Sequence, residues 1–224
     1  MESEEPMIEK KSPPATTYFS VDIETDGLAP GLHSMLSLGC VAYGVDYADT
    51  GALSVMALGE ISINFDRLPG ATVCTKTMTE FWDRFPEQHA ATRRDLHAPG
   101  DGIRAFRDWI AANSPNASKR DRIFVASPSS FDMSFVSYYS HRFLKEDLFH
   151  YVPVDLSSLL AGFQRSEPSQ VRLHDYALSK GITQREETKH IALPDAQYQG
   201  QIFRVLYNEI ADENVDRAER IAGQ

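Results

Sequence analysis

The hydrophobic periodicity of this chain changes near Pro69 and Gly70, and this change limits its possible folds more than any other property of the sequence. Three β-rich segments precede it, at residues 17–21, 35–43 and 53–65. A turn that contains Gly and Asp joins the second segment to the third, which predicts an antiparallel meander. After the change, apolar residues recur at helical spacing in 79–94 and 101–112, so two helices should follow the meander.

Strands and helices alternate in the second half of the chain. Residues 122–126 and 151–154 are short apolar runs, typical of buried strands. Further helices are predicted at 130–144, 156–163, 173–180 and 194–211. A meander followed by alternating units predicts an α/β fold, with a mixed sheet of antiparallel and parallel strands and helices on both faces. This order of elements suits a ribonuclease H-like fold, whose functional crevice we expect at the carboxyl ends of the central strands.

Length and composition indicate a single domain, which we place at residues 15–212. Residues 1–14 are acidic and contain proline, which predicts a disordered leader, and residues 213–224 are expected to form a C-terminal tail. No apolar run is long enough to span a membrane. The leader lacks the basic and apolar stretches of a signal peptide, which favours a cytoplasmic location.

The first β-rich segment ends in Asp22-Ile23-Glu24. Residues two apart in an extended chain share one face, so the two carboxylates should lie side by side. They repel each other unless a cation lies between them, and oxygen ligands favour Mg²⁺ or Mn²⁺. An Asp-x-Glu triplet also arises by chance about once in a chain of average composition, so this one is a weak signal alone.

Three more aspartates fall at predicted helix starts: Asp132, Asp155 and Asp195. An acidic side chain there complements the positive helix end, and capping alone is enough to explain Asp155. His190 precedes Asp195 by five residues on a loop, from which its ring can reach the same crevice as a general base. Taken alone, a histidine of this kind is more often a surface loop residue.

Together, Asp22-Ile-Glu24, Phe131-Asp132 and His190-x4-Asp195 resemble, in order and spacing, the three exonuclease motifs of the DEDDh superfamily. This superfamily of 3′-5′ exonucleases includes the proofreading exonuclease subunit, ribonuclease T and oligoribonuclease. The resemblance covers about residues 17 to 210. The run from Asp22 to Gly27 and the Ser-Met-Leu-Ser-Leu-Gly segment that follows it look closest to bacterial and phage exoribonuclease-like members.

The resemblance implies two divalent cations, Mg²⁺ or Mn²⁺. Asp22 would bridge them, Glu24 and Asp195 would complete one site, and Asp132 would act through water or at the second site. One ion would acidify a water molecule, His190 would take its proton, and the other ion would stabilise the departing 3′ oxygen, which releases a 5′-mononucleotide. Activity should then rise through pH about 6.5, the ordinary pKa of histidine.

The resemblance also implies contacts to the substrate. Thr25 and Leu28 would touch the terminal nucleotide, and Phe131 or Trp82 would stack on its base, although core packing is the more common role for a tryptophan such as Trp82. Many relatives carry His-Asn where this chain has Ser127-Pro128, so contacts there should differ. Relatives are often dimers, which makes a homodimer an expectation for this chain too.

The net charge of −10 opposes non-specific binding to duplexes, so we expect the partner to be a short single-stranded 3′ end of DNA or RNA. Two other functions stay open at this point. One is a non-catalytic ribonuclease H-like module that binds nucleic acid or serves as a scaffold. The other is a phosphodiesterase for small substrates such as dinucleotides, which a negative surface mildly favours.

Overall fold

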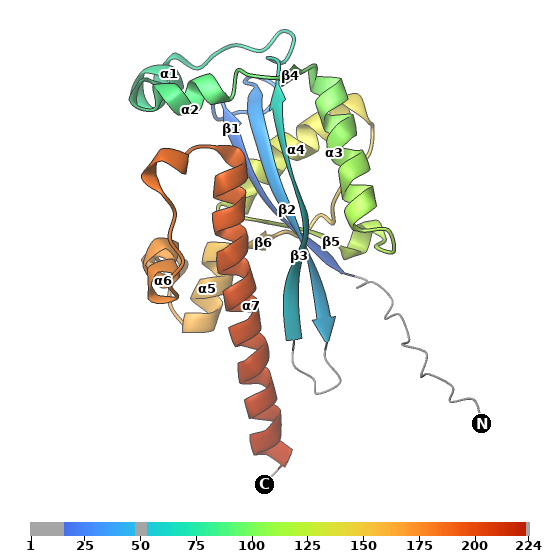
Figure 1. Ribbon diagram of the computed structural model, residues 1–224, viewed down its shortest axis with the longest axis vertical. Coiled ribbons are helices and arrows are strands. Elements are labelled where there is room, and N and C mark those ends of the chain that lie inside the picture. Colours follow the sequence, from blue (N-terminus) through green and yellow to red (C-terminus); the bar gives the residue numbers. More distant parts are fainter. Residues whose placement is uncertain (1–15, 48–52, 223–224) are drawn as a thin grey trace, which may run out of the picture.

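The predicted meander is present and forms one half of a six-stranded mixed sheet (Figure 1). The computed structural model describes residues 16–47 and 53–222, so the predicted leader lies outside the described residues. The strands are β1 (Thr17–Thr25), β2 (Met35–Tyr47), β3 (Leu53–Phe65), β4 (Leu96–His97), β5 (Arg122–Ala126) and β6 (Val154–Asp155). Their order across the sheet is β4-β3-β2-β1-β5-β6. The pairs β1–β2 and β2–β3 are antiparallel, and the other three pairs are parallel.

Helices cover both faces of the sheet, as the order of elements predicts (Figure 1). The α-helices are α1 (Thr75–Glu80), α2 (Pro86–Ala91), α3 (Pro99–Asn113), α4 (Ser129–Phe143), α5 (Leu156–Gln164), α6 (Leu173–Ser179) and α7 (Ala192–Ala222). Short 3₁₀ turns include η1 (Trp82–Arg84), η2 (Lys119–Asp121), η3 (Pro168–Gln170) and η4 (Glu186–Thr188). Helices α3 and α4 pack on one face, and the long helix α7 packs on the other with α5. No helix of the described residues combines the length and apolarity needed to cross a membrane.

Two predicted helices differ from the observed ones. The helix predicted over 79–94 is broken into α1, η1 and α2, and the break falls just before Pro86, the first residue of α2. Proline disfavours a helical conformation in the preceding residue, which explains this position. The last helix was predicted to end near Ala211 but continues to Ala222, through most of the predicted tail. The strand β4 was not predicted, because two residues are too few to show a periodicity.

The side chains of β1 alternate between the two faces. Phe19, Val21 and Ile23 belong to the core cluster that α3 and α4 complete. On the opposite face, the Ser20 hydroxyl donates to the carbonyl oxygen of Ala196 in α7, at 2.8 Å. Because the side-chain period of a strand is two residues, the acidic side chains of β1 also point to the face that α7 covers.

A glycine lets the first turn of α7 rest directly on the sheet. Gly39 lies in β2 opposite Asp22. A Cβ atom at Gly39 would lie 2.3 Å from the carbonyl carbon and oxygen of Ala192. Glycine inside a strand often marks such a close approach of another backbone. The start of α7 is therefore held beside the acidic residues of β1.

Candidate active site

Four carboxylates approach one another near the end of β1. Asp22 and Glu24 come from β1, Asp132 from the first turn of α4, and Asp195 from the first turn of α7. Burial raises the pKa of Asp22 well above its ordinary value, and the charges of the other three carboxylates raise it further. Burial, and then Asp195 and Asp132, likewise raise the pKa of Glu24. The sequence motifs thus converge in space, and their negative charges interact.

Backbone and amide groups fix the direction of these carboxylates. The N–H of Ile23 donates to Asp132 Oδ1 at 3.1 Å, which ties the start of α4 to β1 between Asp22 and Glu24. Burial raises the pKa of Asp132 to about 7 even though this hydrogen bond favours the charged form. Gln199, about one turn beyond Asp195 in α7, donates from Nε2 to Asp22 Oδ1 at 2.8 Å.

Asp195 is held from the loop that precedes α7. The N–H of His190 donates to Asp195 Oδ2 at 2.9 Å, and the side-chain amide of Gln184 donates to Oδ1. Burial raises the pKa of Asp195, while these two donors oppose the rise. The same short segment therefore carries the histidine and orients the carboxylate.

His190 faces this group of carboxylates. One ligand atom each from Glu24, His190 and Asp195 lies within 4.8 Å of the other two. Burial lowers the pKa of His190, and the charge of Asp195 only partly offsets this effect. The imidazole is therefore neutral near pH 7 and able to accept a proton.

The donor set fits a hard divalent cation. It consists of carboxylate oxygens with one imidazole nearby, and oxygen-rich sets of this kind favour Mg²⁺ or Mn²⁺. The raised pKa values mean that the charged carboxylates are costly together, and a cation between them removes that cost. The Oε1 atom of Gln199 is also buried there without a partner among the described residues.

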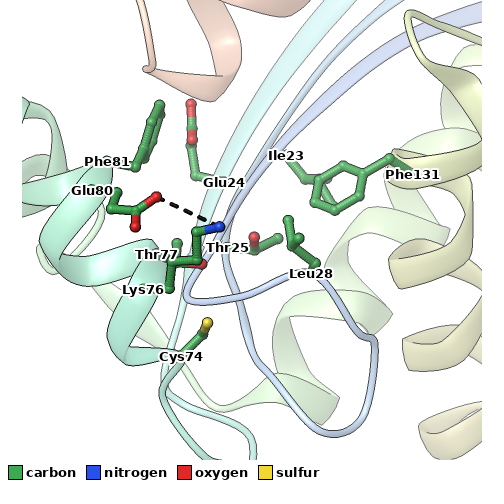
Figure 2. Close-up of a pocket in the computed structure, with 10 residues that line it drawn as sticks. All are labelled: Ile23, Glu24, Thr25, Leu28, Cys74, Lys76, Thr77, Glu80, Phe81 and Phe131. Atoms are coloured by element: carbon green, nitrogen blue, oxygen red, sulfur yellow. Dashed lines mark ion pairs between the residues drawn. The ribbon is translucent and has the colours of Figure 1, made fainter.

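A cavity of about 450 Å³ opens beside Glu24 (Figure 2). Such a volume suits one nucleotide. Three predicted substrate contacts, Thr25, Leu28 and Phe131, line it, and Leu28 is 75% exposed at its edge. Phe81 lies across the cavity from Phe131 (Figure 2). The remaining lining residues are Ile23, Cys74, Lys76, Thr77 and Glu80.

Trp82, the fourth predicted substrate contact, lies in the interior instead. It is 2% exposed and does not line the cavity. Its indole N–H donates to the carbonyl oxygen of Thr25 at 2.9 Å, just after an irregularity in the pairing of β1 with β2. Trp82 therefore supports the end of β1 from the protein interior, as expected of a core residue.

A second cavity, of about 320 Å³, lies on the side of Asp22 and Asp195. His190 and Ser127 contribute to its wall, and the rest comes mainly from α6, α7 and the loop between them. Ser127 belongs to the Ser127-Pro128 pair, where the resemblance predicts different substrate contacts. Asp155 caps α5 by accepting from the N–H of Ser158 at 2.9 Å, the role expected for it.

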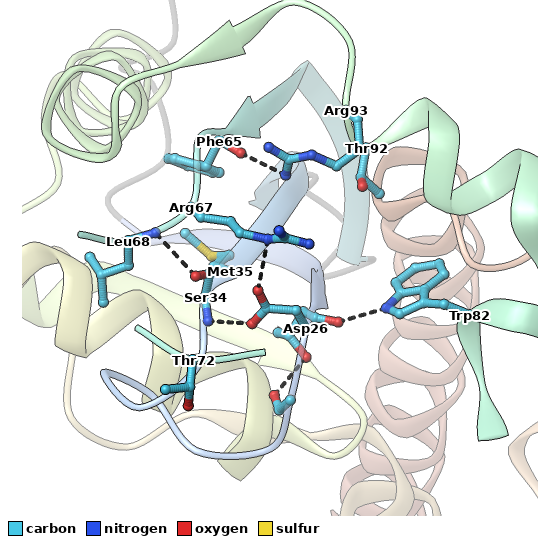
Figure 3. A network of polar contacts seen from close by, with 12 residues as sticks. Asp26, Ser34, Met35, Phe65, Arg67, Leu68, Thr72, Trp82, Thr92 and Arg93 are labelled. Atoms are coloured by element: carbon cyan, nitrogen blue, oxygen red, sulfur yellow. Dashed lines mark hydrogen bonds and ion pairs between the residues drawn. The ribbon is translucent and has the colours of Figure 1, made fainter. Parts of the chain in front are cut away.

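A buried aspartate fixes the loops around the larger cavity (Figure 3). Asp26 is fully buried, and its Oδ1 accepts from the N–H of Ser34 at 2.6 Å. Its other oxygen lies 3.4 Å from Nε of Arg67, and its carbonyl oxygen accepts from the N–H of Cys74 at 2.9 Å. Ser34 in turn accepts from the N–H of Leu68 at 3.1 Å. Asp26 thus joins the end of β1 to two loops, the one before β2 and the one between β3 and α1.

The sequence motifs do not include several residues of the site: Asp26, Gly39, Phe81, Gln184, Gln199 and Phe85, whose ring contacts that of His190. Gly39 carried a usable signal, since glycine within a strand suggests a close backbone approach. The two phenylalanines fall within the helical spacing of residues 79–94, which carries no functional signal. The glutamines gave no signal, because an amide becomes a carboxylate partner only when the fold brings the two together.

Known proteins resemble this chain in sequence and in fold. Residues 17–207 match the family model of the Rv2179c-like 3′-5′ exoribonuclease domain. The protein "3′-5′ DNA exonuclease Cap18" of Escherichia coli is 30% identical over 205 residues, which cover 89% of this chain and 96% of that protein.

Solved structures extend the likeness of the fold. Exonuclease I of E. coli in complex with a dT13 oligonucleotide has a TM-score of 0.62 at 11% identity, covering 91% of this chain and 43% of that one. Cell-death related nuclease 4 has a TM-score of 0.61 at 12% identity, covering 88% and 65%. A 3′-exonuclease that recognises the histone mRNA stem-loop has a TM-score of 0.58 at 9% identity, covering 88% and 84%. The chain spans less than half of exonuclease I, so that likeness concerns the fold.

Proposed function

This chain belongs to the Rv2179c-like 3′-5′ exoribonuclease domain family, and we propose that it removes 5′-mononucleotides one at a time from single-stranded nucleic acid by metal-dependent hydrolysis. One observation carries the proposal. Acidic side chains from β1, α4 and α7 meet beside a cavity of nucleotide size. That arrangement provides a place for the scissile phosphate and a place for the terminal nucleoside.

The carboxylates would hold two divalent cations, Mg²⁺ or Mn²⁺. Asp22, whose pKa is raised by the charges of Asp132, Glu24 and Asp195, would hold these ions jointly with those three carboxylates. When bound, the ions would supply positive charge at the phosphate and acidify a water molecule. The hydrogen bonds from Ile23 and Gln199 then keep Asp132 and Asp22 in fixed directions.

His190 would act as the general base. Its lowered pKa keeps the ring neutral at neutral pH, so a ring nitrogen can accept the proton of the attacking water. Asp195 accepts a hydrogen bond from the backbone of His190, so one loop places the base and a metal ligand together.

The terminal nucleotide would occupy the larger cavity. Leu28 would contact the base at the open edge, Thr25 would lie beside the sugar, and Phe131 would offer an apolar face for stacking. The net charge of −10 leaves little attraction for a long duplex, which favours a short single-stranded 3′ end as substrate.

The test uses oligonucleotides labelled at the 5′ end, as single-stranded DNA, single-stranded RNA and duplex DNA, with Mn²⁺, Mg²⁺ or chelator. We expect a ladder shortened from the 3′ end that requires metal, and 5′-mononucleotides as product. Asp22→Asn serves as the inert control. Binding without shortening would support the scaffold function, and cleavage of dinucleotides alone would support a small-substrate phosphodiesterase. Shortening that continues in chelator would contradict the proposal.

A second experiment separates a base from a ligand at His190. His190→Gln should slow turnover by about 10²- to 10⁴-fold. Calorimetric titration with Mn²⁺ should give nearly the wild-type affinity. Because an imidazole nitrogen lies within 4.8 Å of ligand atoms of Glu24 and Asp195, weaker Mn²⁺ binding by this variant would identify His190 as a metal ligand instead.

A further inference from the structure

Two aromatic rings hold the imidazole of His190. The ring of Phe85 has its centroid 4.2 Å from that of His190, at an interplanar angle of 50°. The ring of Phe81 lies 4.8 Å away and meets the imidazole edge-on, at 82°. The Phe81 distance is ordinary for an aromatic pair and the Phe85 distance is slightly shorter, and two such contacts from different directions restrict both rotation and tilt of the imidazole.

His190 has a backbone conformation that its surroundings must maintain. Its φ angle is 60°, in the left-handed region that residues other than glycine seldom adopt. A residue keeps such a conformation only where its surroundings impose it. The bond from its N–H to Asp195 fixes the backbone, but no hydrogen bond to the ring is found among the described residues. The aromatic contacts are therefore the restraint on the ring itself.

Both phenylalanines are carried by a firmly anchored segment. The N–H of Phe85 donates to the carbonyl oxygen of Trp82 at 2.9 Å, and the indole of Trp82 is bonded to Thr25 at the end of β1. The indole also stacks on His89, with centroids 5.0 Å apart. Through these contacts, the position of the imidazole is set relative to β1, the strand that carries Glu24.

We propose that Phe81 and Phe85 are positioning residues that hold the His190 imidazole in place for proton transfer. The proposal rests on the function assigned to His190 above. Phe81 has a second surface, because it also lines the nucleotide cavity (Figure 2), whereas Phe85 does not. A base bound in that cavity would press on the same ring that touches the imidazole, so Phe81 links occupation of the cavity to the placement of the base.

The simpler explanation of Phe81 is that it stacks on the substrate base. Stacking and positioning of His190 can be distinguished by experiment. A residue that only stacks affects KM and has no effect on a substrate whose last nucleotide lacks a base. A residue that positions His190 affects kcat with either substrate. Phe85 is the sharper probe, because it contacts the imidazole without lining the cavity.

The experiment compares Phe85→Leu and Phe81→Leu on oligonucleotides with a normal or an abasic 3′-terminal residue. We expect kcat to fall about 10- to 100-fold for both variants and both substrates, the usual effect of misplacing a catalytic group by a fraction of an ångström to one ångström. Phe85→Tyr should retain most of the wild-type kcat, because it keeps the ring. Phe163→Leu, a half-buried phenylalanine of α5 away from the site, is the matched control for lost core packing.

The chemical shifts of the His190 ring protons report the position of the imidazole independently of turnover. The ring protons of His190, identified by their loss in His190→Gln, should be displaced by the ring currents of the two phenylalanines in the wild type. They should move toward ordinary histidine positions in each leucine variant, with or without Mg²⁺. Circular dichroism confirms that the variants are folded.

Three results would overturn the proposal, and the first two can be told apart. A fully active Phe85→Leu together with an impaired His190→Gln would remove the positioning role and leave the general base. A His190→Gln enzyme with wild-type kcat would remove the base and the positioning role together. Unmoved His190 ring resonances in Phe85→Leu would also refute the contact.

Discussion

Gly39→Ala tests whether the contact between β2 and α7 positions the active site. The added Cβ would lie 2.3 Å from the backbone of Ala192, whereas ordinary contact begins at 3.4 Å. The obstacle is main chain, which cannot rotate away, so the start of α7 must move by about 1 Å. Asp195 and His190 both lie within or just before that first turn. Displacement of a catalytic group by about 1 Å can lower turnover about 10²-fold.

Stability should fall much less than activity. Overpacking of this kind usually costs about 1–3 kcal/mol of the free energy of unfolding. The assay measures kcat on single-stranded oligonucleotide in saturating Mn²⁺, and urea unfolding of the same samples gives stability. Gly162→Ala is the control, because a Cβ at this position of α5 meets nothing within 4 Å. It should keep full activity and gain about 0.5–1 kcal/mol in stability.

A Gly39→Ala variant that turns over at the wild-type rate would refute a positioning role for this contact. A kcat that falls only in proportion to the unfolded fraction would refute it too, since the lost activity would then come from general instability. A crystal structure of the variant should show the first turn of α7 displaced from β2, with the rest of the sheet unchanged.

The remaining predictions concern pH and capping. Burial raises the pKa of Asp132 from 3.8 to about 7, so the folded metal-free protein keeps a proton that the unfolded chain releases. The free energy of unfolding should therefore decrease between about pH 4 and pH 7, and Asp132→Asn should flatten this decrease in urea titrations without metal. Burial lowers the pKa of His190, so the rise of kcat with pH should have its midpoint below the ordinary 6.5, and a flat profile from about pH 5 to 9 would exclude a histidine base. Asp155→Ala removes the cap of α5 and should cost about 0.5–2 kcal/mol of stability, measured by thermal unfolding, and a smaller change than this would mean that solvent replaces the cap.

The fold was largely predictable because its signals are local. Alternating apolar residues, turns and helical spacing identified the meander and the later strand and helix units, and the ribonuclease H-like fold and a 3′-5′ exonuclease family are confirmed. The spacing of Asp22 and Glu24 correctly predicted one shared face, since a strand has a period of two residues. Pro86 also indicates the break in the helix that precedes it, although the helical spacing of the phenylalanines favours one continuous helix.

The rest of the site depends on contacts between residues far apart in the chain. Gln199 meets Asp22 across 177 positions, and nothing near either residue indicates the pairing. The side chain of Trp82 is of a type that can stack on a base or pack in the core, and only its burial in the structure shows that it packs in the core. The motifs therefore identify the groups proposed for the chemistry, while the groups that orient them come from the contacts of α7 and η1 with β1.

The network around Asp26 affects how the substrate specificity of this enzyme can be changed. Asp26 bonds mainly to the backbone N–H and carbonyl groups of Ser34 and to the N–H of Cys74, so the loop framework does not depend on the side chains that face the cavity. Lys76, Thr77 and Glu80 can then be exchanged on a frame that keeps its shape. This separation makes the wall of the cavity a natural target for library selection toward a chosen base or sugar, with the proposed metal ligands left untouched.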